Sequence, residues 1–202
     1  DCKGDMIWSK TYGGINSDNG WCMYQTNDNG YAISGYTETY GNGNGKADAF
    51  LLKTDPAGVM QWFRTYGTAD REVINRIKQT KDSGYVMVGR RMDVVSNAIA
   101  DLYIIKTDVN GNMLWGKTFG SNLYDEGLDI IEDANGDLVA IGETTIFGTG
   151  IRNIYAVKTD KNGNILWSYA YGMSNTVASG RGIEKTSDGV YLLGGKIYQL
   201  ST

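Results

Sequence analysis

The feature that most constrains the fold of this chain is an internal repeat with a period of 52 to 54 residues. A Trp, an aromatic residue four positions later and the Gly that follows it recur together, and a second Gly and the triplet Lys-Thr-Asp recur with nearly the same spacing. A fixed period of this length indicates equivalent supersecondary units that stack on one another. The recurring positions are Trp8, Trp62, Trp115 and Trp167; Tyr12, Tyr66, Phe119 and Tyr171; Gly13, Gly67, Gly120 and Gly172; Gly35, Gly89, Gly142 and Gly195; and the triplets 53–55, 106–108 and 158–160.

Each repeat contains four short segments that have the composition of β-strands. In the first repeat they are residues 21–26, 31–36, 49–54 and 60–66, which are rich in Tyr, Trp, Ile and Phe and often alternate with polar residues. Asn, Asp and Gly in the intervening turns supply the positive φ angles that tight hairpins require. Four hairpin-linked strands in each of four units predict an all-β fold, namely a four-bladed β-propeller that forms one domain over residues 1–202.

The two ends of the chain match the repeat and predict how the propeller closes. Residues 197–202 align with the third strand at 154–159, and residues 1–8 align with 160–167. We therefore expect blades at about residues 20–67, 73–120 and 127–172, and a last blade of about 180–202 plus 1–13. The N-terminal strand would complete that blade, either in its own chain or in a neighbouring copy. The expected closure residues are Met6, Ile7, Trp8, Lys10 and Tyr12, with Ile197, Tyr198 and Leu200.

The consensus of the repeat points to a known kind of protein. It reads Gly-Asn-x-Leu-Trp-x-Lys-Thr-Tyr-Gly, then Asp-x-Gly-Tyr-x-x-x-Gly, then Asp-x-Tyr-x-x-Lys-Thr-Asp. Over essentially the whole chain it resembles the β-propeller repeats of secreted and cell-surface proteins from bacteria and archaea. The resemblance implies an extracellular location and no shared catalytic motif. The four-unit architecture also resembles toroidal propeller subunits that stack into extracellular filaments.

Composition narrows the possible functions. The chain has no His, which excludes catalytic units and metal sites that need imidazole. It has 19 basic and 23 acidic residues, so its charge does not favour nucleic acid as a partner. No apolar run approaches the roughly 20 residues of a membrane span. We therefore expect a protein that is not an enzyme and has no resident cofactor.

Two sets of repeated residues are candidate sites, and each has a structural alternative. The repeated Trp, Tyr and Phe could stack against sugars, but their regular recurrence favours a packing role between units. Asp18, Glu72 and Asp125 occupy equivalent positions and could form a ring of hard oxygen ligands for Ca²⁺. The favoured alternative is that each carboxylate caps the turn next to it.

Cys2 and Cys22 are the only cysteines of the chain. Cys2 lies in a predicted turn and Cys22 near the start of a predicted first strand, which places them on opposite faces of a propeller disc. We therefore expect an interchain rather than an intrachain disulfide, with a buried Cys22 thiol and an incidental Cys2 as the alternative.

These observations favour a secreted structural protein that self-assembles into an extracellular filament or stack, with other copies as its partners. The first alternative is a monomeric binding module for a glycan or a surface protein. Its ligand would meet the loops that break the repeat, at residues 37–47, 90–100 and 144–152. The second alternative is a part of a larger propeller.

Overall fold

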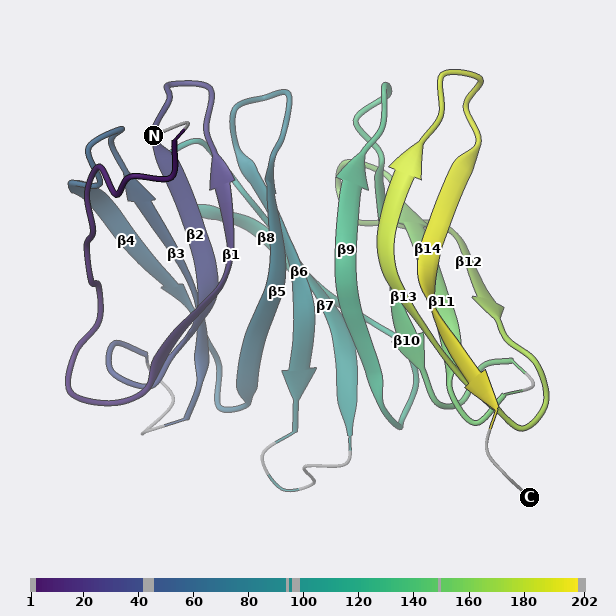
Figure 1. Ribbon diagram of the computed structural model, residues 1–202. Coiled ribbons are helices and arrows are strands. Elements are labelled where there is room, and N and C mark those ends of the chain that lie inside the picture. Colours follow the sequence, from purple (N-terminus) through teal and green to yellow (C-terminus); the bar gives the residue numbers. More distant parts are fainter. Residues whose placement is uncertain (1–2, 42–45, 94, 96–98, 149, 200–202) are drawn as a thin grey trace.

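The computed structural model describes residues 3–41, 46–93, 95, 99–148 and 150–199, which form an array of antiparallel sheets (Figure 1). Three sheets are four-stranded meanders, which we call sheets A, B and C, and sheet D has two strands. The strands are β1 (Asp18–Gln25), β2 (Tyr31–Thr37), β3 (Asp48–Thr54) and β4 (Met60–Tyr66) in sheet A; β5 (Arg71–Gln79), β6 (Tyr85–Met92), β7 (Ala100–Thr107) and β8 (Met113–Phe119) in sheet B; β9 (Asp125–Glu132), β10 (Leu138–Thr144), β11 (Asn153–Thr159) and β12 (Ile165–Tyr171) in sheet C; and β13 (Thr176–Lys185) and β14 (Tyr191–Gln199) in sheet D.

The sheets follow one another in chain order, from sheet A near the N-terminus to sheet D near the C-terminus (Figure 1). The first strands of neighbouring sheets, β1, β5, β9 and β13, pack side by side. This propeller-like arrangement confirms the predicted all-β fold, and three of the sheets have the four antiparallel strands that were predicted for each unit. The part of the chain that the structure describes contains no helix long and apolar enough to cross a membrane.

The hairpin turns have the backbone conformations that their sequences predict. Gly58, Gly111 and Gly163 have φ angles of 73°, 75° and 74°. Gly111 must also be small, because a Cβ atom there would lie 2.7 Å from the Trp62 ring of the preceding sheet. The repeated Asp-x-x-Gly turn therefore serves both the hairpin and the packing of one sheet on the next.

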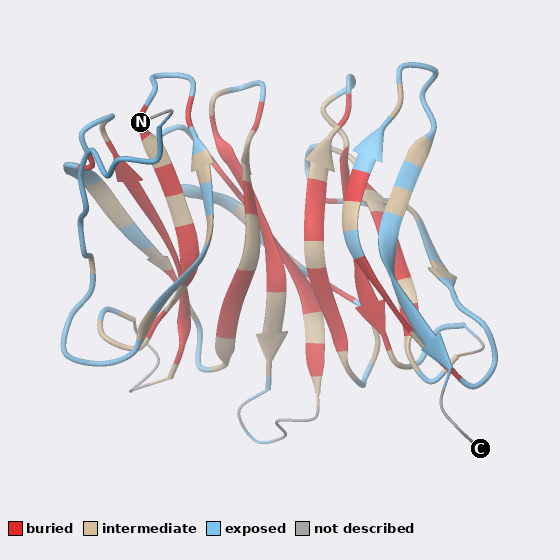
Figure 2. Ribbon diagram, viewed as in Figure 1, coloured by how far each residue is buried: buried red, intermediate tan, exposed pale blue. Residues whose placement is uncertain are grey.

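The core lies between the sheets and becomes smaller toward sheet D. The clusters between sheets A and B and between sheets B and C each contain ten buried residues, whereas the cluster between sheets C and D contains four. Leu51 and Met87 belong to the first cluster, Ile104 and Leu138 to the second, and Ile183 to the third. Each such side chain contributes about 1.5–3 kcal/mol when fully buried. Figure 2 shows this gradient as buried middle strands beside a largely exposed β14.

Each of the four first strands carries a β-bulge at the equivalent position. The pairing register shifts between Gly20 and Cys22 in β1, and equivalent shifts occur in β5, β9 and β13. A bulge leaves one residue unpaired and redirects its side chain. The residues at the four bulges are Trp21, Asn75, Leu128 and Arg181.

The prediction that Ile197 and Tyr198 belong to a third strand is wrong. Both lie in β14, where Tyr198 pairs with Val177 of β13. β14 is the second strand of its unit, because Gly195 pairs with Gly180 in the same way as Gly89 pairs with Ile74 in sheet B. The predicted alignment failed because the apolar pattern of residues 197–199 continues the second strand without an intervening turn.

The predicted closure of the last unit by the N-terminal strand of the same chain is also not formed. Residues 3–17 belong to no strand, and within the described part of the chain sheet D contains only β13 and β14. Figure 1 places the N-terminal segment beside sheet A, at the opposite end of the array from sheet D. Sheets B and C lie between sheets A and D, so the N-terminal segment, which packs on sheet A, lies away from β14.

Candidate functional site

The N-terminal segment, residues 3–17, lies on sheet A in the same way that β4, the fourth strand of sheet A, lies on sheet B. The Trp8 ring meets the Tyr31 ring edge to face at 5.9 Å, and the Tyr12 hydroxyl donates a hydrogen bond to the Gly58 carbonyl at 2.5 Å. Between sheets A and B the equivalent contacts are Trp62 with Tyr85 at 6.0 Å and Tyr66 with the Gly111 carbonyl at 2.7 Å. Residues 8–12 therefore occupy the position of a fourth strand, although they belong to no sheet.

A cavity of about 530 Å³ remains between this segment and sheet A. Its walls include Ile33, Phe50 and Phe63 from the sheet, and Tyr40 closes one side. Tyr40 packs edge to face on Phe63 at 5.4 Å and donates a hydrogen bond to the Gly13 carbonyl at 2.9 Å. The first repeat-breaking loop thus holds the N-terminal segment through Tyr40, while residues 42–45, 94, 96–98 and 149 of the three loops lie outside the described residues.

Of the repeated aromatics, the Tyr or Phe four positions after each Trp is buried at the junctions and exposed beside sheet D. Tyr66 and Phe119 are 7% and 5% exposed, whereas the equivalent Tyr171 is 47% exposed. Trp62, Trp115 and Trp167 are half-buried, and Trp8 is 40% exposed. The burial of Tyr66 comes from the β7–β8 turn of the next sheet, and sheet D has no such turn among its described residues.

The Lys of each Lys-Thr-Asp triplet fastens the first hairpin of its own sheet, a role that our sequence analysis missed. Lys53 donates to Asp28 at 2.8 Å, Lys106 to Asp82 at 2.8 Å and Lys158 to Asp133 at 2.9 Å. The joint recurrence of the triplet and of an acidic turn could have revealed this pairing. Asp188, the equivalent of Asp28 in sheet D, has no lysine partner within the described part of the chain.

The lysine contacts shift the titration of their partners. The hydrogen bonds from Lys53 and then from Thr26 lower the pKa of Asp28 to about 2. Burial opposes ionisation of Asp133, but hydrogen bonds from Lys158, from the Asn135 backbone and from Tyr191 outweigh it and hold its pKa well below the usual range. These carboxylates therefore stabilise the fold in their ionised form.

The three carboxylates of the predicted cation ring each hold their own turn. Asp18 accepts a hydrogen bond from the backbone N–H of Gly14 at 2.8 Å, and Glu72 and Asp125 accept equivalent bonds from residues four positions earlier, at 3.3 and 2.7 Å. These are the contacts of the capping interpretation. The described residues contain no group of three acidic or Cys side chains that could hold a metal ion. Calcium binding stays a prediction, and calcium titration with thermal melting tests it.

Of the two cysteines, the structure describes Cys22. Cys22 is a free, half-exposed thiol that packs beside the core between sheets A and B. Cys2 and the closure residue Leu200 lie outside the described residues. Electrophoresis without reductant tests the interchain disulfide.

The comparisons with known proteins support the fold and leave the function open. No family model and no curated protein matches this chain. Its structure is similar to the crystal structure of a protein of unknown function from Bacteroides caccae, with a TM-score of 0.51 and 11% sequence identity. The match covers 85% of this chain and 51% of that one, so the chain spans about half the length of its structural neighbour. At this identity the likeness shows the fold alone.

Proposed function

We propose that this is a secreted structural protein whose copies associate head to tail through the open side of sheet D. The observation that carries the proposal is the contrast between Tyr66 or Phe119, which the next sheet buries, and Tyr171, which stays exposed. In sheet C, the surface around Tyr171 would receive the outer strands of the next sheet. Among the described residues nothing occupies that place.

The receiving surface combines an unpaired strand edge with apolar side chains. β14 pairs with β13 on one side only, and its other edge has no partner strand in the described part of the chain. Leu192, Ile197 and Tyr198 are 59%, 51% and 49% exposed along this strand. An exposed apolar edge is a template for strand addition from another chain.

The N-terminal segment of a neighbouring copy is the proposed donor. It already has the contacts of an outer strand, through Trp8 and Tyr12, yet its backbone is in no sheet. Met6 and Ile7 are 81% and 76% exposed. Pairing along the β14 edge of a second copy, in the place that a third strand takes in the other sheets, would bury these side chains and supply backbone partners to both strands. Donor and acceptor are different surfaces, so repeated addition makes a ring or an open filament.

Light scattering after size-exclusion chromatography tests this proposal. The mass should rise with protein concentration, and a synthetic peptide of residues 1–13 should bind the chain and prevent that rise. Ile197→Lys should abolish association because a charge on an edge strand blocks pairing. Val109→Lys is the matched control, since Val109 is also exposed, at 49%, but lies in the β7–β8 turn. A monomer at every concentration that does not bind the peptide would contradict the proposal.

The alternative of a larger propeller has its own observation. Asp188 matches a position that elsewhere meets the lysine of a third strand, and residues 1–13 contain the Asp-x-x-Gly turn and the fourth-strand pattern but no Lys-Thr-Asp triplet. A hairpin with the chemistry of β7 and β8 would supply the lysine together with the turn. If a peptide of residues 100–119 binds sheet D and the peptide of residues 1–13 does not, the larger propeller is favoured over strand exchange between copies.

The other alternative, a monomeric extracellular binding module, is supported by a cleft of about 370 Å³ that the first strands of the four sheets line. Its walls are unlike the repeat consensus and include Trp21 and three arginines.

A further inference from the structure

We propose that the cleft along β1, β5, β9 and β13 binds a saccharide that carries a carboxylate, with Arg181 and Trp21 as its principal contacts. This inference stands independently of head-to-tail assembly, and it gives the binding-module alternative a class of ligand. It rests on three observations: the bulges that build the cleft, the chemical difference among the four bulge residues, and an uncompensated arginine.

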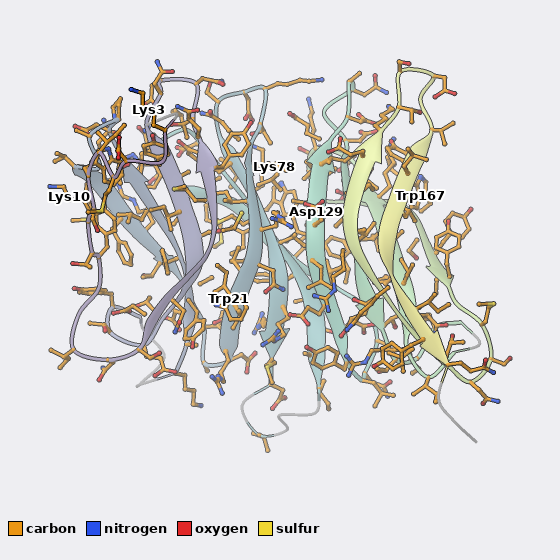
Figure 3. The ribbon with its side chains drawn as sticks, viewed as in Figure 1. Lys3, Lys10, Trp21, Lys78, Asp129 and Trp167 are labelled. Carbon is orange, nitrogen blue, oxygen red and sulfur yellow. The ribbon has the colours of Figure 1, made fainter. Side chains whose placement is uncertain are left out.

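The bulges bring four side chains from four different sheets into one cleft. Each bulge leaves its residue out of the ladder, and all four of these residues line the same cavity. Bulges are typical devices for aiming a side chain at a functional site. Figure 3 labels Trp21 of β1 and Asp129 of β9, two of these first strands. The lining residues are Trp21, Asn75, Arg76, Arg90, Glu126, Leu128 and Arg181.

The residues at equivalent bulges are chemically different, although the rest of the unit is regular. Packing positions repeat nearly the same residue from sheet to sheet, as Trp62, Trp115 and Trp167 do. The bulge positions instead supply an indole, an amide, an isobutyl group and a guanidinium. A structural role common to all four units would not require this difference. A single asymmetric ligand that touches all four units would require it.

The charges in the cleft leave one arginine free for an anion. Arg90 pairs with Glu126, which also accepts hydrogen bonds from Asn75 and Tyr124, and Arg76 lies 3.2 Å from Asp129. The Arg181 side chain makes no hydrogen bond or ion pair with any residue that the structure describes. A chain of net charge −4 therefore presents an uncompensated guanidinium at this place. Guanidinium groups bind carboxylates through two parallel charge-assisted hydrogen bonds.

The remaining groups fit the rest of a sugar ring. The Trp21 side chain is 59% exposed and offers an apolar face on which the C–H bonds of a pyranose can stack. Asn75 and Glu126 place amide and carboxylate oxygens in the same cleft, where they can accept hydrogen bonds from hydroxyl groups. The volume of about 370 Å³ lies within the range of about 300–1,000 Å³ that is usual for small-molecule sites.

Titration calorimetry with D-galacturonic acid and D-glucuronic acid tests the inference. D-galactose and D-glucose are the neutral counterparts, and acetate is the bare carboxylate. At least one acid should bind, and its neutral counterpart and acetate should each bind about tenfold more weakly. Arg181→Gln should weaken binding of the acid about tenfold or more, because a hydrogen bond to a charged group is lost, and Trp21→Ala should weaken both the acid and its neutral counterpart.

Matched controls separate a built site from general electrostatics. Lys161→Gln removes the same charge from an exposed turn of sheet C and should leave binding unchanged. Arg181 and Trp21 are both exposed, so circular dichroism melting should show folded variants. The inference is overturned if neither acid binds, if the neutral sugar or acetate binds as tightly, or if Arg181→Gln and Lys161→Gln behave alike. The state of assembly, measured separately by light scattering, does not enter these outcomes.

Discussion

The junction between sheets A and B and the open side of sheet D show the same residue types in opposite environments. At the junction, Tyr66 is 7% exposed and donates a hydrogen bond to the next sheet, and Lys53 holds Asp28. At sheet D, Tyr171 is 47% exposed and Asp188 has no lysine partner among the described residues. The difference teaches that part of the stability of each unit comes from its own third strand, through Lys53, and part from the outer strands of the unit that follows, through Tyr66.

The largest effect is expected when the two tyrosines at equivalent positions, Tyr66 and Tyr171, are each replaced. Tyr66→Ala should lower the free energy of unfolding by about 3–5 kcal/mol, because it removes a buried ring from the ten-residue cluster between two sheets. Tyr171→Ala should change it by no more than about 0.5 kcal/mol, as expected for an exposed site. Urea unfolding followed by circular dichroism, at a concentration where the chain is monomeric, measures both. Equal losses would show that sheet D is as well covered as the junction.

The second contrast concerns the acidic turns. Asp133→Asn should lower the free energy of unfolding by about 1.5–3 kcal/mol, because a charge-assisted hydrogen bond from Lys158 is lost, although Lys158 keeps its ion pair with Asp137. Asp188→Asn should leave the urea midpoint unchanged, since its carboxylate is exposed and its hydrogen bond from Thr186 is local. A drop at Asp188 as large as that at Asp133 would break the comparison.

The repeat made the regular part of the fold predictable. The four-stranded units and their turns follow from alternating apolar residues and from Gly58, Gly111 and Gly163 at positive φ. The ends were not predictable in the same way. Residues 197–199 have the composition of a third strand but pair as the end of a second strand, because register is set by the partner strand and not by local pattern.

The candidate cleft could not be read from the sequence for a related reason. Trp21, Asn75, Leu128 and Arg181 share no chemical type, so no repeated marker connects them. Only the bulges in the strand pairing show that they are equivalent and that they face one cavity. The Lys-Thr-Asp triplet was visible, but the partner of its lysine lies about 25 positions earlier in each unit and was not paired with it.

A smaller effect is expected in the pH dependence of stability, through the acidic turn residues Asp28 and Asp133. The pKa of Asp28, about 2, lies below its unfolded value of about 3.9, and that of Asp133 is lowered as well. Their stabilising contribution is complete above about pH 4 and is lost as the pH falls through the folded values. The melting temperature should therefore fall between about pH 4 and about pH 2, and less steeply in Asp133→Asn. Parallel curves for the two proteins would show that Asp133 is not a source of the acid sensitivity.

The smallest effect is expected at Glu72, whose titration has the opposite sign. Burial raises the pKa of Glu72, and the charge of Asp48 adds to it, although hydrogen bonds from Thr68 oppose the shift. A raised folded pKa means that stability is greatest below the unfolded pKa, about 4.3, and falls as the pH rises through the folded value. Glu72→Gln keeps a side-chain oxygen for Thr68 and removes the charge. It should melt like the wild type near pH 4 and at a higher temperature near pH 7. A variant that is less stable at pH 7 would instead show that the ionised carboxylate is needed there, as the calcium-ring prediction requires.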